Sequence, residues 1–288
     1  MREVVVISGK GGTGKTSLTG ALAGAAENMI ICDLDVDAPD LHILLEPDMH
    51  EVHEFYSGNE AVINSEKCVR CGLCVEMCKY GAVSETEEGF QVNPLRCEGC
   101  KVCVAFCPEE AVDFPERHCG RWYISNTRFG TMVHAGLFPG AENSGRLVTL
   151  LREQARQKAG EQGKELILCD GAPGIGCPVI SSLSNTDLAV IVTEPTLSGL
   201  HDLTRVSDLC AYFKIQTAVI INKSDLNSEQ AEIIQGFCLD RGIELAGTLP
   251  YDPEVTLAMS RKQAITEVEG SHTADQIRKI RDRIQEML

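Results

Sequence analysis

The sequence is short of aromatic residues, of positive charge and of long apolar runs. Phe, Trp and Tyr make up 5% of the 288 residues, with a single Trp. No segment approaches the roughly 18 consecutive apolar residues that a membrane-spanning helix needs. Lys and Arg number 26 against 42 Asp and Glu, and the formal net charge of −16 disfavours binding to nucleic-acid phosphates. We therefore expect no nucleic-acid partner and no membrane attachment.

A secretion signal is also lacking. The N-terminal stretch Met1–Ile7 has the pattern of a short buried strand, and its apolar run is too short for a signal peptide. The chain nevertheless contains 14 cysteines. Without a signal, so many cysteines indicate metal ligation in a reducing compartment and not disulfides. We expect a cytoplasmic protein.

Eight of the cysteines form two matched runs. Both have the spacing Cys-x2-Cys-x2-Cys-x3-Cys of the bacterial ferredoxin run, which holds a [4Fe–4S] cluster through thiolates. By the ferredoxin rule the fourth cysteine of each run ligates the other cluster. Zinc is the alternative, but two complete runs and the Pro108 ending favour two [4Fe–4S] clusters; Lys79 stands where the motif has the first proline. The expected ligand sets are Cys68, Cys71, Cys74 and Cys107 for one cluster, and Cys97, Cys100, Cys103 and Cys78 for the other.

A glycine-rich loop near the N-terminus matches the P-loop pattern. It follows the expected strand Val4–Ser8 and opens the expected helix Thr16–Ala26, which is the context that the motif requires. Its backbone N–H groups would surround phosphates, Lys15 would contact the β- and γ-phosphates, and the Thr16 hydroxyl would ligate Mg²⁺. We expect ATP and Mg²⁺ to bind here. The expected binding residues are Gly9, Lys10, Gly11, Gly12, Thr13, Gly14, Lys15, Thr16 and Ser17.

Strand and helix patterns alternate on both sides of the cysteine runs. Such alternation predicts an α/β P-loop fold with a mostly parallel sheet and helices on both faces. The cysteine segment would then be a small α+β ferredoxin-like insert after the second strand. The expected domains are 1–60 and 120–288 for the ATPase and 61–119 for the insert. The main expected elements are strands at 29–32, 122–125, 131–134, 165–169, 188–193 and 217–222, and helices at 146–157, 198–213, 228–241 and 272–288.

Lys10, between the first glycines, carries a family resemblance. The stretch Lys10–Thr16 resembles the deviant Walker A loop of the MinD/ParA superfamily, which includes the nitrogenase iron protein. The whole chain resembles members with an inserted ferredoxin domain. The resemblance implies that Lys10 reaches across an ATP-dependent homodimer, or a heterodimer with a related ATPase. It also implies that Asp35 positions the attacking water, Asp170 holds Mg²⁺ through water, Gly174 senses the γ-phosphate and Asn222 touches adenine. The run Asn222–Asp225 also suits guanine, but the deviant loop favours ATP.

Three functions fit these motifs. The leading interpretation is an ATPase that couples nucleotide state to electron transfer from two clusters to an unidentified redox or cluster-client protein. The alternatives are a metallocluster scaffold or carrier, and a MinD-like positioning or regulatory ATPase with redox-sensing clusters. Cys177, with a cysteine such as Cys119, could hold a bridging cluster. Four further cysteines are expected in the core: Cys32, Cys169, Cys210 and Cys238. One apolar face of the 272–288 helix is expected to dock on the ATPase body, through Ile277, Ile280, Ile284 and Leu288.

Overall fold

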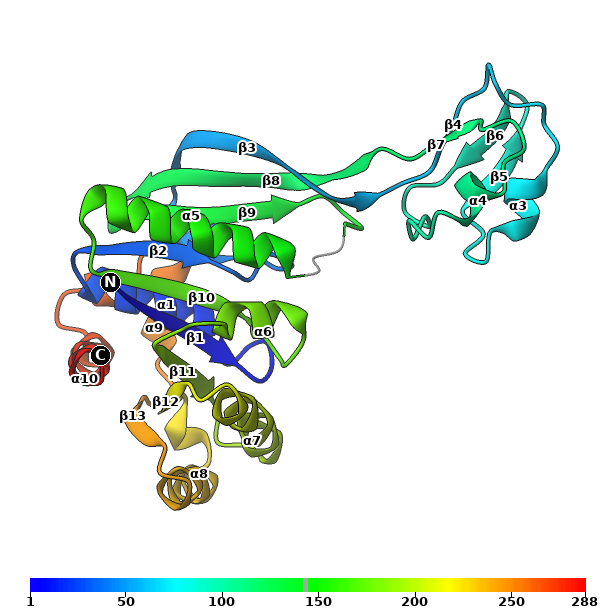
Figure 1. Cartoon of the computed structure of the whole chain (residues 1–288). Helices are drawn as coiled ribbons and strands as arrows, with labels where there is room; N and C mark the ends of the chain where they lie inside the picture. Colours follow the sequence, from blue (N-terminus) through cyan, green and yellow to red (C-terminus); the bar gives the residue numbers. More distant parts are fainter. Residues whose placement is uncertain (142–144) are drawn as a thin grey trace. The chain divides into compact units, whose positions relative to one another are not determined.

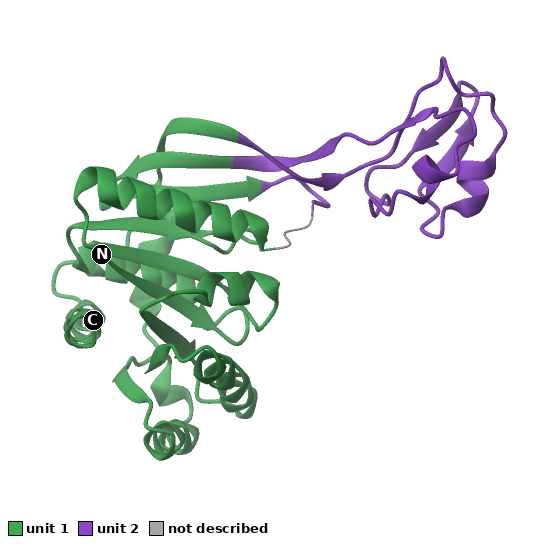
Figure 2. Cartoon of the chain, in the orientation of Figure 1, with its two compact units in different colours: residues 1–53, 122–136, 143–288 green, residues 54–121, 137–142 purple. Residues whose placement is uncertain are grey.

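The computed structural model describes residues 1–141 and 145–288, and they form two compact units (Figures 1 and 2). Unit 1 comprises Met1–His53, Trp122–Gly136 and the described residues from 145 to Leu288. Unit 2 comprises Glu54–Arg121 and the described residues 137–141. The long strands β3 and β8 contribute residues to both units. The exact domain limits expected from the sequence, 61–119 for the insert, stay a prediction.

A nine-stranded sheet runs through the described residues in the order β13-β12-β11-β1-β10-β2-β9-β8-β3. The neighbouring strands from β13 to β9 pair in parallel, and the arrows of β8 and β9 point in opposite directions in Figure 1. The expected α/β fold with a mostly parallel sheet is confirmed. The strands are β1 (Arg2–Ser8), β2 (Met29–Asp33), β3 (Asp48–Asn59), β8 (Glu116–Thr127), β9 (Gly130–Leu137), β10 (Leu166–Pro173), β11 (Leu188–Thr193), β12 (Gln216–Ile221) and β13 (Glu244–Thr248).

Helices cover both faces of this sheet (Figure 1). On one face, α1, α2 and α10 enclose an apolar core with side chains of the parallel strands. On the other face, α5, α6, α7 and α8 contact the strands. The helices are α1 (Lys15–Ala25), α2 (Leu41–Leu45), α5 (Arg146–Gln162), α6 (Cys177–Leu183), α7 (Leu197–Tyr212), α8 (Ser228–Asp240), α9 (Pro253–Ser260) and α10 (His272–Glu286), with short 3₁₀ turns η1 (Ser224–Leu226) and η2 (Ile265–Glu267).

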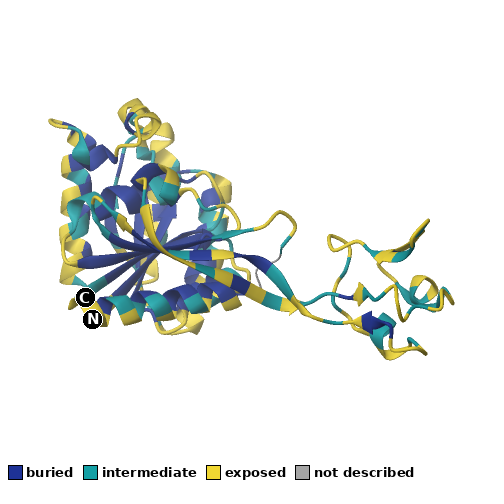
Figure 3. Ribbon diagram, turned by 90° about the horizontal axis from the view of Figure 1, so that it is seen from above, coloured by how far each residue is buried: buried dark blue, intermediate teal, exposed yellow. Residues whose placement is uncertain are grey.

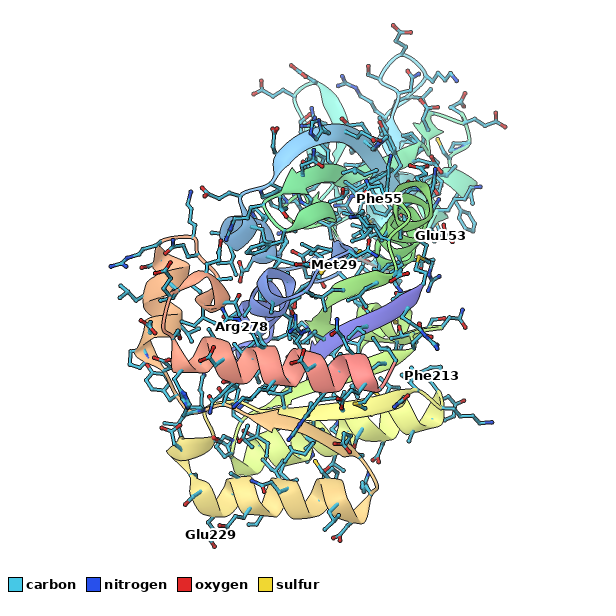
Figure 4. The ribbon with its side chains drawn as sticks, turned by 90° about the vertical axis from the view of Figure 1, so that its left-hand side faces the viewer. Met29, Phe55, Glu153, Phe213, Glu229 and Arg278 are labelled. Atoms are coloured by element: carbon cyan, nitrogen blue, oxygen red, sulfur yellow. The ribbon has the colours of Figure 1, made fainter. Side chains whose placement is uncertain are left out.

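The apolar face of α10 packs inward as expected. Ile277, Ile280 and Ile284 are buried in the core cluster and Leu288 packs against it. Arg278, labelled in Figure 4, lies at the flank of this face, where it donates a hydrogen bond to the Thr266 carbonyl at 3.0 Å. Burial is densest in the central strands, which are dark blue in Figure 3. Every helix of the described residues is too short or too polar to cross a membrane.

Unit 2 contains two small antiparallel sheets and two short helices. Val62 and Ile63 pair with Asp113 and Val112, while a second hairpin pairs Val83 with Val92. Each half of the unit therefore supplies one strand to the first sheet, consistent with an internal repeat. Its elements are β4 (Val62–Ile63), α3 (Leu73–Met77), β5 (Val83–Thr86), β6 (Gly89–Val92), α4 (Val102–Ala105) and β7 (Val112–Asp113).

Candidate nucleotide site and cysteine cavity

The glycine-rich loop connects β1 to α1 and depends on its glycines for shape. Gly12 and Gly14 have φ of +83° and +88°, a region that side chains disfavour. A Cβ at Gly14 would lie 2.4 Å from Asn222 Nδ2. That amide donates a hydrogen bond to the Thr13 carbonyl oxygen at 2.8 Å. Asn222, which follows β12 far along the chain, is thus fixed against the loop.

Lys15 and Thr16 lie in a cluster of acidic side chains at the carboxyl ends of the central strands. The Lys15 ammonium is 2.9 Å from Asp170 Oδ1 and 3.3 Å from Asp35 Oδ2. The Thr16 hydroxyl donates to Asp170 Oδ2 at 2.7 Å. Lys15 and Asp170 are buried, with 6% and 0% of their side chains exposed. Four of the expected site residues are therefore brought together, although their chemical roles stay predictions.

Asp33 belongs to the same cluster and was not among the expected site residues. It pairs in register with Asp170 on the neighbouring strand β10. Its Oδ1 accepts the Asp35 N–H at 3.1 Å, while its buried Oδ2 has no hydrogen-bond partner among the described residues. The sequence signal was present, because Asp33 and Asp170 both follow buried apolar runs.

The electrostatics of this cluster favour an added cation. Burial, together with the neighbouring Asp170, raises the pKa of Asp33 well above its ordinary value, and burial also raises the pKa of Asp35. Burial opposes the charge of Lys15, but Asp170 and Asp35 outweigh it and raise the lysine pKa. Three carboxyl groups thus face a single ammonium, and carboxylates are the ligands that Mg²⁺ prefers. An added cation would balance this excess of negative charge, although no three acidic side chains among the described residues are placed to hold a metal ion in this structure.

Lys10 is held by residues of its own chain. Its ammonium donates to Ser198 Oγ at 3.1 Å and lies 3.6 Å from Glu194 Oε2. Glu194 also pairs with Lys223 at 2.5 Å. Gly174 adopts φ of +91° and its N–H donates to the Ser8 carbonyl oxygen at 2.8 Å. This bond fixes Gly174 beside the start of the P-loop.

A cavity of about 200 Å³ opens beside the loop. Its wall includes Gly12, Gly14 and Asn222. The opposite side includes Leu249–Asp252, a segment that the motif analysis missed because no pattern marks it. A flat aromatic base would fit next to a phosphate site here, with Asn222 at the junction.

In unit 2, a separate apolar cavity is lined by four thiols from the two cysteine runs. Cys68, Cys71 and Cys74 come from the first run, and Cys107 comes from the second. This is the first ligand set expected from the ferredoxin rule. Val69, Phe90 and Val112 are among the apolar residues of the wall. Four thiols beside an apolar lining are the donor type and number that a [4Fe–4S] cluster takes, one thiolate for each iron.

The two runs have matching local geometry. Cys78 Sγ accepts the Ala82 N–H, and Cys107 Sγ accepts the Ala111 N–H, both at 3.3 Å. Burial opposes ionisation of Cys78, yet several backbone N–H groups, Ala82 first, lower its pKa. Hydrogen bonds of this kind support a thiolate.

The start of each run is bonded to the end of the other. The Asn64 N–H donates to the Ala111 carbonyl at 2.8 Å, and the Asn93 N–H donates to the Ala82 carbonyl at 2.7 Å. Asn64 precedes the first run, and Ala111 follows the second. Asn93 precedes the second run, and Ala82 follows the first. These bonds bring the end of each run beside the start of the other, an arrangement compatible with ligation by the fourth cysteine of the opposite run.

A family model for the CobQ/CobB/MinD/ParA nucleotide-binding domain (CbiA) matches residues 4–265. The chain belongs to this family. An uncharacterized protein of Methanocaldococcus jannaschii is 27% identical over 99% of this chain and 97% of its own length. The carbon monoxide dehydrogenase accessory protein CooC of Rhodospirillum rubrum is 28% identical over 88% of this chain and 86% of its own.

Solved structures show the same fold as this CbiA-family chain. The cell-division ATPase MinD of Pyrococcus furiosus superposes with a TM-score of 0.59 at 17% identity, covering 100% of this chain and 99% of its own. MinD of Pyrococcus horikoshii, complexed with Mg-ADP, has a TM-score of 0.59 at 16% identity, with coverage of 99% and 96%. The nucleotide-binding assignment of the P-loop domain thus follows from family membership.

The remaining cysteines of this CbiA-family protein separate into two groups. The four expected in the core are buried, which confirms that prediction, and Cys119 is buried as well. Cys177, at the start of α6, is exposed. Among residues 1–141 and 145–288, no group of three or more His, Cys, Asp or Glu side chains is placed to hold a metal ion. A bridging cluster at Cys177 stays a prediction.

Proposed function

We propose that this protein hydrolyses ATP and couples its nucleotide state to electron transfer from two [4Fe–4S] clusters to a partner protein. The observation that carries the proposal is the cavity lined by Cys68, Cys71, Cys74 and Cys107, in a chain of the nucleotide-binding family. A donor set drawn from both runs supports the two-cluster ferredoxin-like module. An active unit of two chains, as in the resembling superfamily, belongs to the same proposal.

The residues of the P-loop domain supply each requirement of phosphoryl transfer. Lys15 would exchange its contacts with Asp170 and Asp35 for the β- and γ-phosphates. Thr16 and Asp170, already joined by a hydrogen bond, would hold Mg²⁺. Asp35, released from Lys15, would orient the attacking water, because this reaction needs positioning more than strong base chemistry. Asn222, which follows β12 and is held against the loop by its bond to Thr13, would contact the base.

The cysteines would hold the clusters in two sets of four. Cys78, whose thiolate is supported by backbone N–H groups, would complete the set of Cys97, Cys100 and Cys103. The bound clusters supply one-electron redox chemistry. Cys71 is exposed and the other three cysteines of the first set are part-buried, so the apolar wall would shield this cluster from water only in part. That partial burial and the N–H···S bonds would tune its potential.

The test is a redox titration of the anaerobically purified protein, followed by electron paramagnetic resonance, with Mg-ADP and with a non-hydrolysable ATP analogue. Coupling predicts a difference in midpoint potential of about 60 mV or more, a tenfold change in a one-electron equilibrium. Iron analysis should show about eight iron atoms per chain, as two [4Fe–4S] clusters require. Equal potentials in both nucleotide states would contradict the coupling.

A metallocluster carrier is the second candidate, favoured by the similarity to an accessory protein of carbon monoxide dehydrogenase. A carrier would bind clusters weakly enough to release them. Incubation with an apo-ferredoxin and a chelator separates the two functions. ATP-dependent iron transfer without any nucleotide effect on the potentials would favour the carrier, and retention of all iron would exclude it.

A further inference from the structure

The cavity beside the P-loop has an exposed methionine in its wall. Met259 lies near the end of α9, is 38% exposed and lines this cavity together with Ser17. Met49, on β3, is also exposed, whereas Met29 and Met132 are buried. Met259 is thus open to a reagent in solution at the cavity where we expect the nucleotide.

The sulfur atom of Met259 is bonded to the helix that follows the P-loop. The Ser17 hydroxyl donates a hydrogen bond to Met259 Sδ at 2.9 Å. Ser17 lies in the first turn of α1, next to Thr16, whose own hydroxyl donates to Asp170 Oδ2 at 2.7 Å. A chemical change at this sulfur therefore acts directly on the neighbour of the expected Mg²⁺ ligand.

Oxidation is the chemical change to which a thioether is prone. A peroxide such as hydrogen peroxide transfers one oxygen atom to sulfur: the sulfur–oxygen bond forms as the oxygen–oxygen bond breaks, the sulfur loses two electrons, and water leaves. The reaction needs access to the sulfur but no ionisation, because a thioether carries no proton. The product, methionine sulfoxide, is polar where methionine is apolar, and methionine sulfoxide reductases return it to the thioether. Met259 therefore has the chemistry of a reversible oxidation site.

A sulfoxide at Met259 would not fit the present arrangement. With 2.9 Å between Met259 Sδ and Ser17 Oγ, no room is left for an oxygen atom between them. Either Ser17 moves, or the new oxygen turns into the cavity, where Leu18, Val255 and Ile265 are among the lining residues. An oxygen turned to solvent instead leaves an oxidised sulfur, no longer an acceptor, facing the Ser17 hydroxyl. Each change disturbs Ser17 or the cavity and so opposes nucleotide binding.

We propose that Met259 is an oxidation site through which peroxide weakens nucleotide binding at the P-loop. The inference rests on the nucleotide site, which family membership supports, and needs neither the clusters nor hydrolysis. It adds to the proposed function a way in which an oxidant lowers the occupancy of that site.

The first measurement locates the oxidation. The anaerobically purified full-length protein is treated with hydrogen peroxide, with and without Mg²⁺ and a non-hydrolysable ATP analogue, and its peptides are analysed by mass spectrometry. We expect one added oxygen atom on Met259 and on Met49, because both are exposed. Bound nucleotide should lower the oxidation of Met259 at least threefold, since it restricts access to the sulfur, and should leave Met49 unchanged.

The second measurement compares the affinity for a fluorescent ATP analogue before and after peroxide, with each protein as its own reference. The unmodified protein should lose about fivefold in affinity, and methionine sulfoxide reductases A and B should restore it where dithiothreitol does not. Met259→Leu has a side chain of similar volume without sulfur and should stay within about twofold. Met49→Leu, at an exposed position of β3, is the matched control and should lose as much affinity as the unmodified protein.

Four outcomes would overturn the inference. Oxidation of Met49 with no oxygen added to Met259 would show that the Met259 sulfur is shielded, and equal oxidation with and without nucleotide would place it outside the occupied cavity. Complete oxidation of Met259 with unchanged affinity would show that the site tolerates the sulfoxide. An equal loss in Met259→Leu would assign the effect to the cysteines or clusters, so iron content is measured in every sample. Failure of the proposed function is read separately, from phosphate release and cluster potentials of the untreated protein.

Discussion

The nucleotide site contains more carboxyl groups than positive charges. Substitution of Asp35 tests whether one of these carboxyl groups acts in ATP hydrolysis. Asp35→Asn keeps the size of the side chain but removes the charge that we propose orients the attacking water. We expect the hydrolysis rate to fall on the order of 100-fold, with nucleotide affinity nearly unchanged. Because burial raises the pKa of Asp35, activity of the unmodified protein should decline as the pH falls through that raised value.

Phosphate release measured between pH 5 and 8 checks this prediction. The Asp35→Asn variant should show a flatter profile over the acidic part of the range. Asp40→Asn, an exposed position on the same segment, serves as the control and should retain activity. A variant at Asp35 with full activity would exclude its role in positioning water.

His134 makes folding stability sensitive to pH. It is 4% exposed, hydrogen-bonded to Ser125 Oγ at 2.9 Å and stacked on Tyr123. Burial, and to a smaller degree His42, lowers its pKa to about 4. The unfolded chain therefore binds this proton first, and up to about 3 kcal/mol of stability is lost as the pH falls from about 6.5 towards 4.

Urea unfolding of unit 1, followed by Trp122 fluorescence at pH 7 and pH 5, measures this loss. His134→Gln should reduce the difference between the two pH values, even if it lowers stability at both. The exposed His201 gives the matched control, since His201→Gln should leave the difference unchanged. An unaltered pH dependence in the His134 variant would assign the acid sensitivity to other groups.

Among the elements, the P-loop makes the sharpest prediction. A Cβ at Gly14 would be 2.4 Å from Asn222 Nδ2, and the backbone there has φ of +88°. Gly14→Ala should therefore displace Asn222, break its bond to Thr13 and weaken ATP at least tenfold. A methyl group added at Gly160 on α5 would meet no described atom of another element within 4 Å, and Gly160→Ala should leave ATP affinity unchanged. Both affinities can be measured by isothermal titration calorimetry.

Secondary structure was predicted best where burial follows a clear period. Helices α5, α7 and α8 and strand β11 begin at or within one residue of their expected positions, because apolar residues recur with helical or strand spacing. Strand β3 was not predicted. Most of its side chains are exposed, so hydrophobic periodicity gave no signal and only its place in the sheet defines it.

The candidate site was predicted in part: the residues of its motifs were named from the sequence, and the residues outside the motifs were not. The P-loop and the cysteine runs have fixed spacings, so their residues could be named in advance. Leu249–Asp252 was missed because no motif marks it, and Asp33 was missed although, like Asp170, it follows a buried apolar run. Their position depends on strand order: β2 lies beside β10, and the segment after β13 lies beside the loop after β1 only when the sheet is assembled.

At the scale of the whole molecule, Lys10 tests whether two chains act together. In this structure it contacts Ser198 and Glu194 of its own chain, whereas the family resemblance implies a contact with a partner's nucleotide. Lys10→Ala should bind ATP normally but hydrolyse it at least tenfold more slowly. For the unmodified protein, hydrolysis per chain should rise with protein concentration.

Analytical ultracentrifugation with ADP and with a non-hydrolysable ATP analogue complements the rate measurement. A dimer should form only with the ATP analogue. Full activity of Lys10→Ala together with a concentration-independent rate would show that each chain works alone.

The chain leaves the large sheet through β3 and returns through its neighbour β8. Just beyond the sheet, the Glu60 N–H donates to the Pro115 carbonyl at 3.2 Å, and Asn59 Nδ2 donates to the Phe114 carbonyl at 3.1 Å. The two connections therefore form an open hairpin whose tip is replaced by the cysteine-rich segment. A two-residue Asn-Gly turn could close that hairpin. The same junction could accept other redox or binding modules, which makes it a natural point for recombination and for protein engineering.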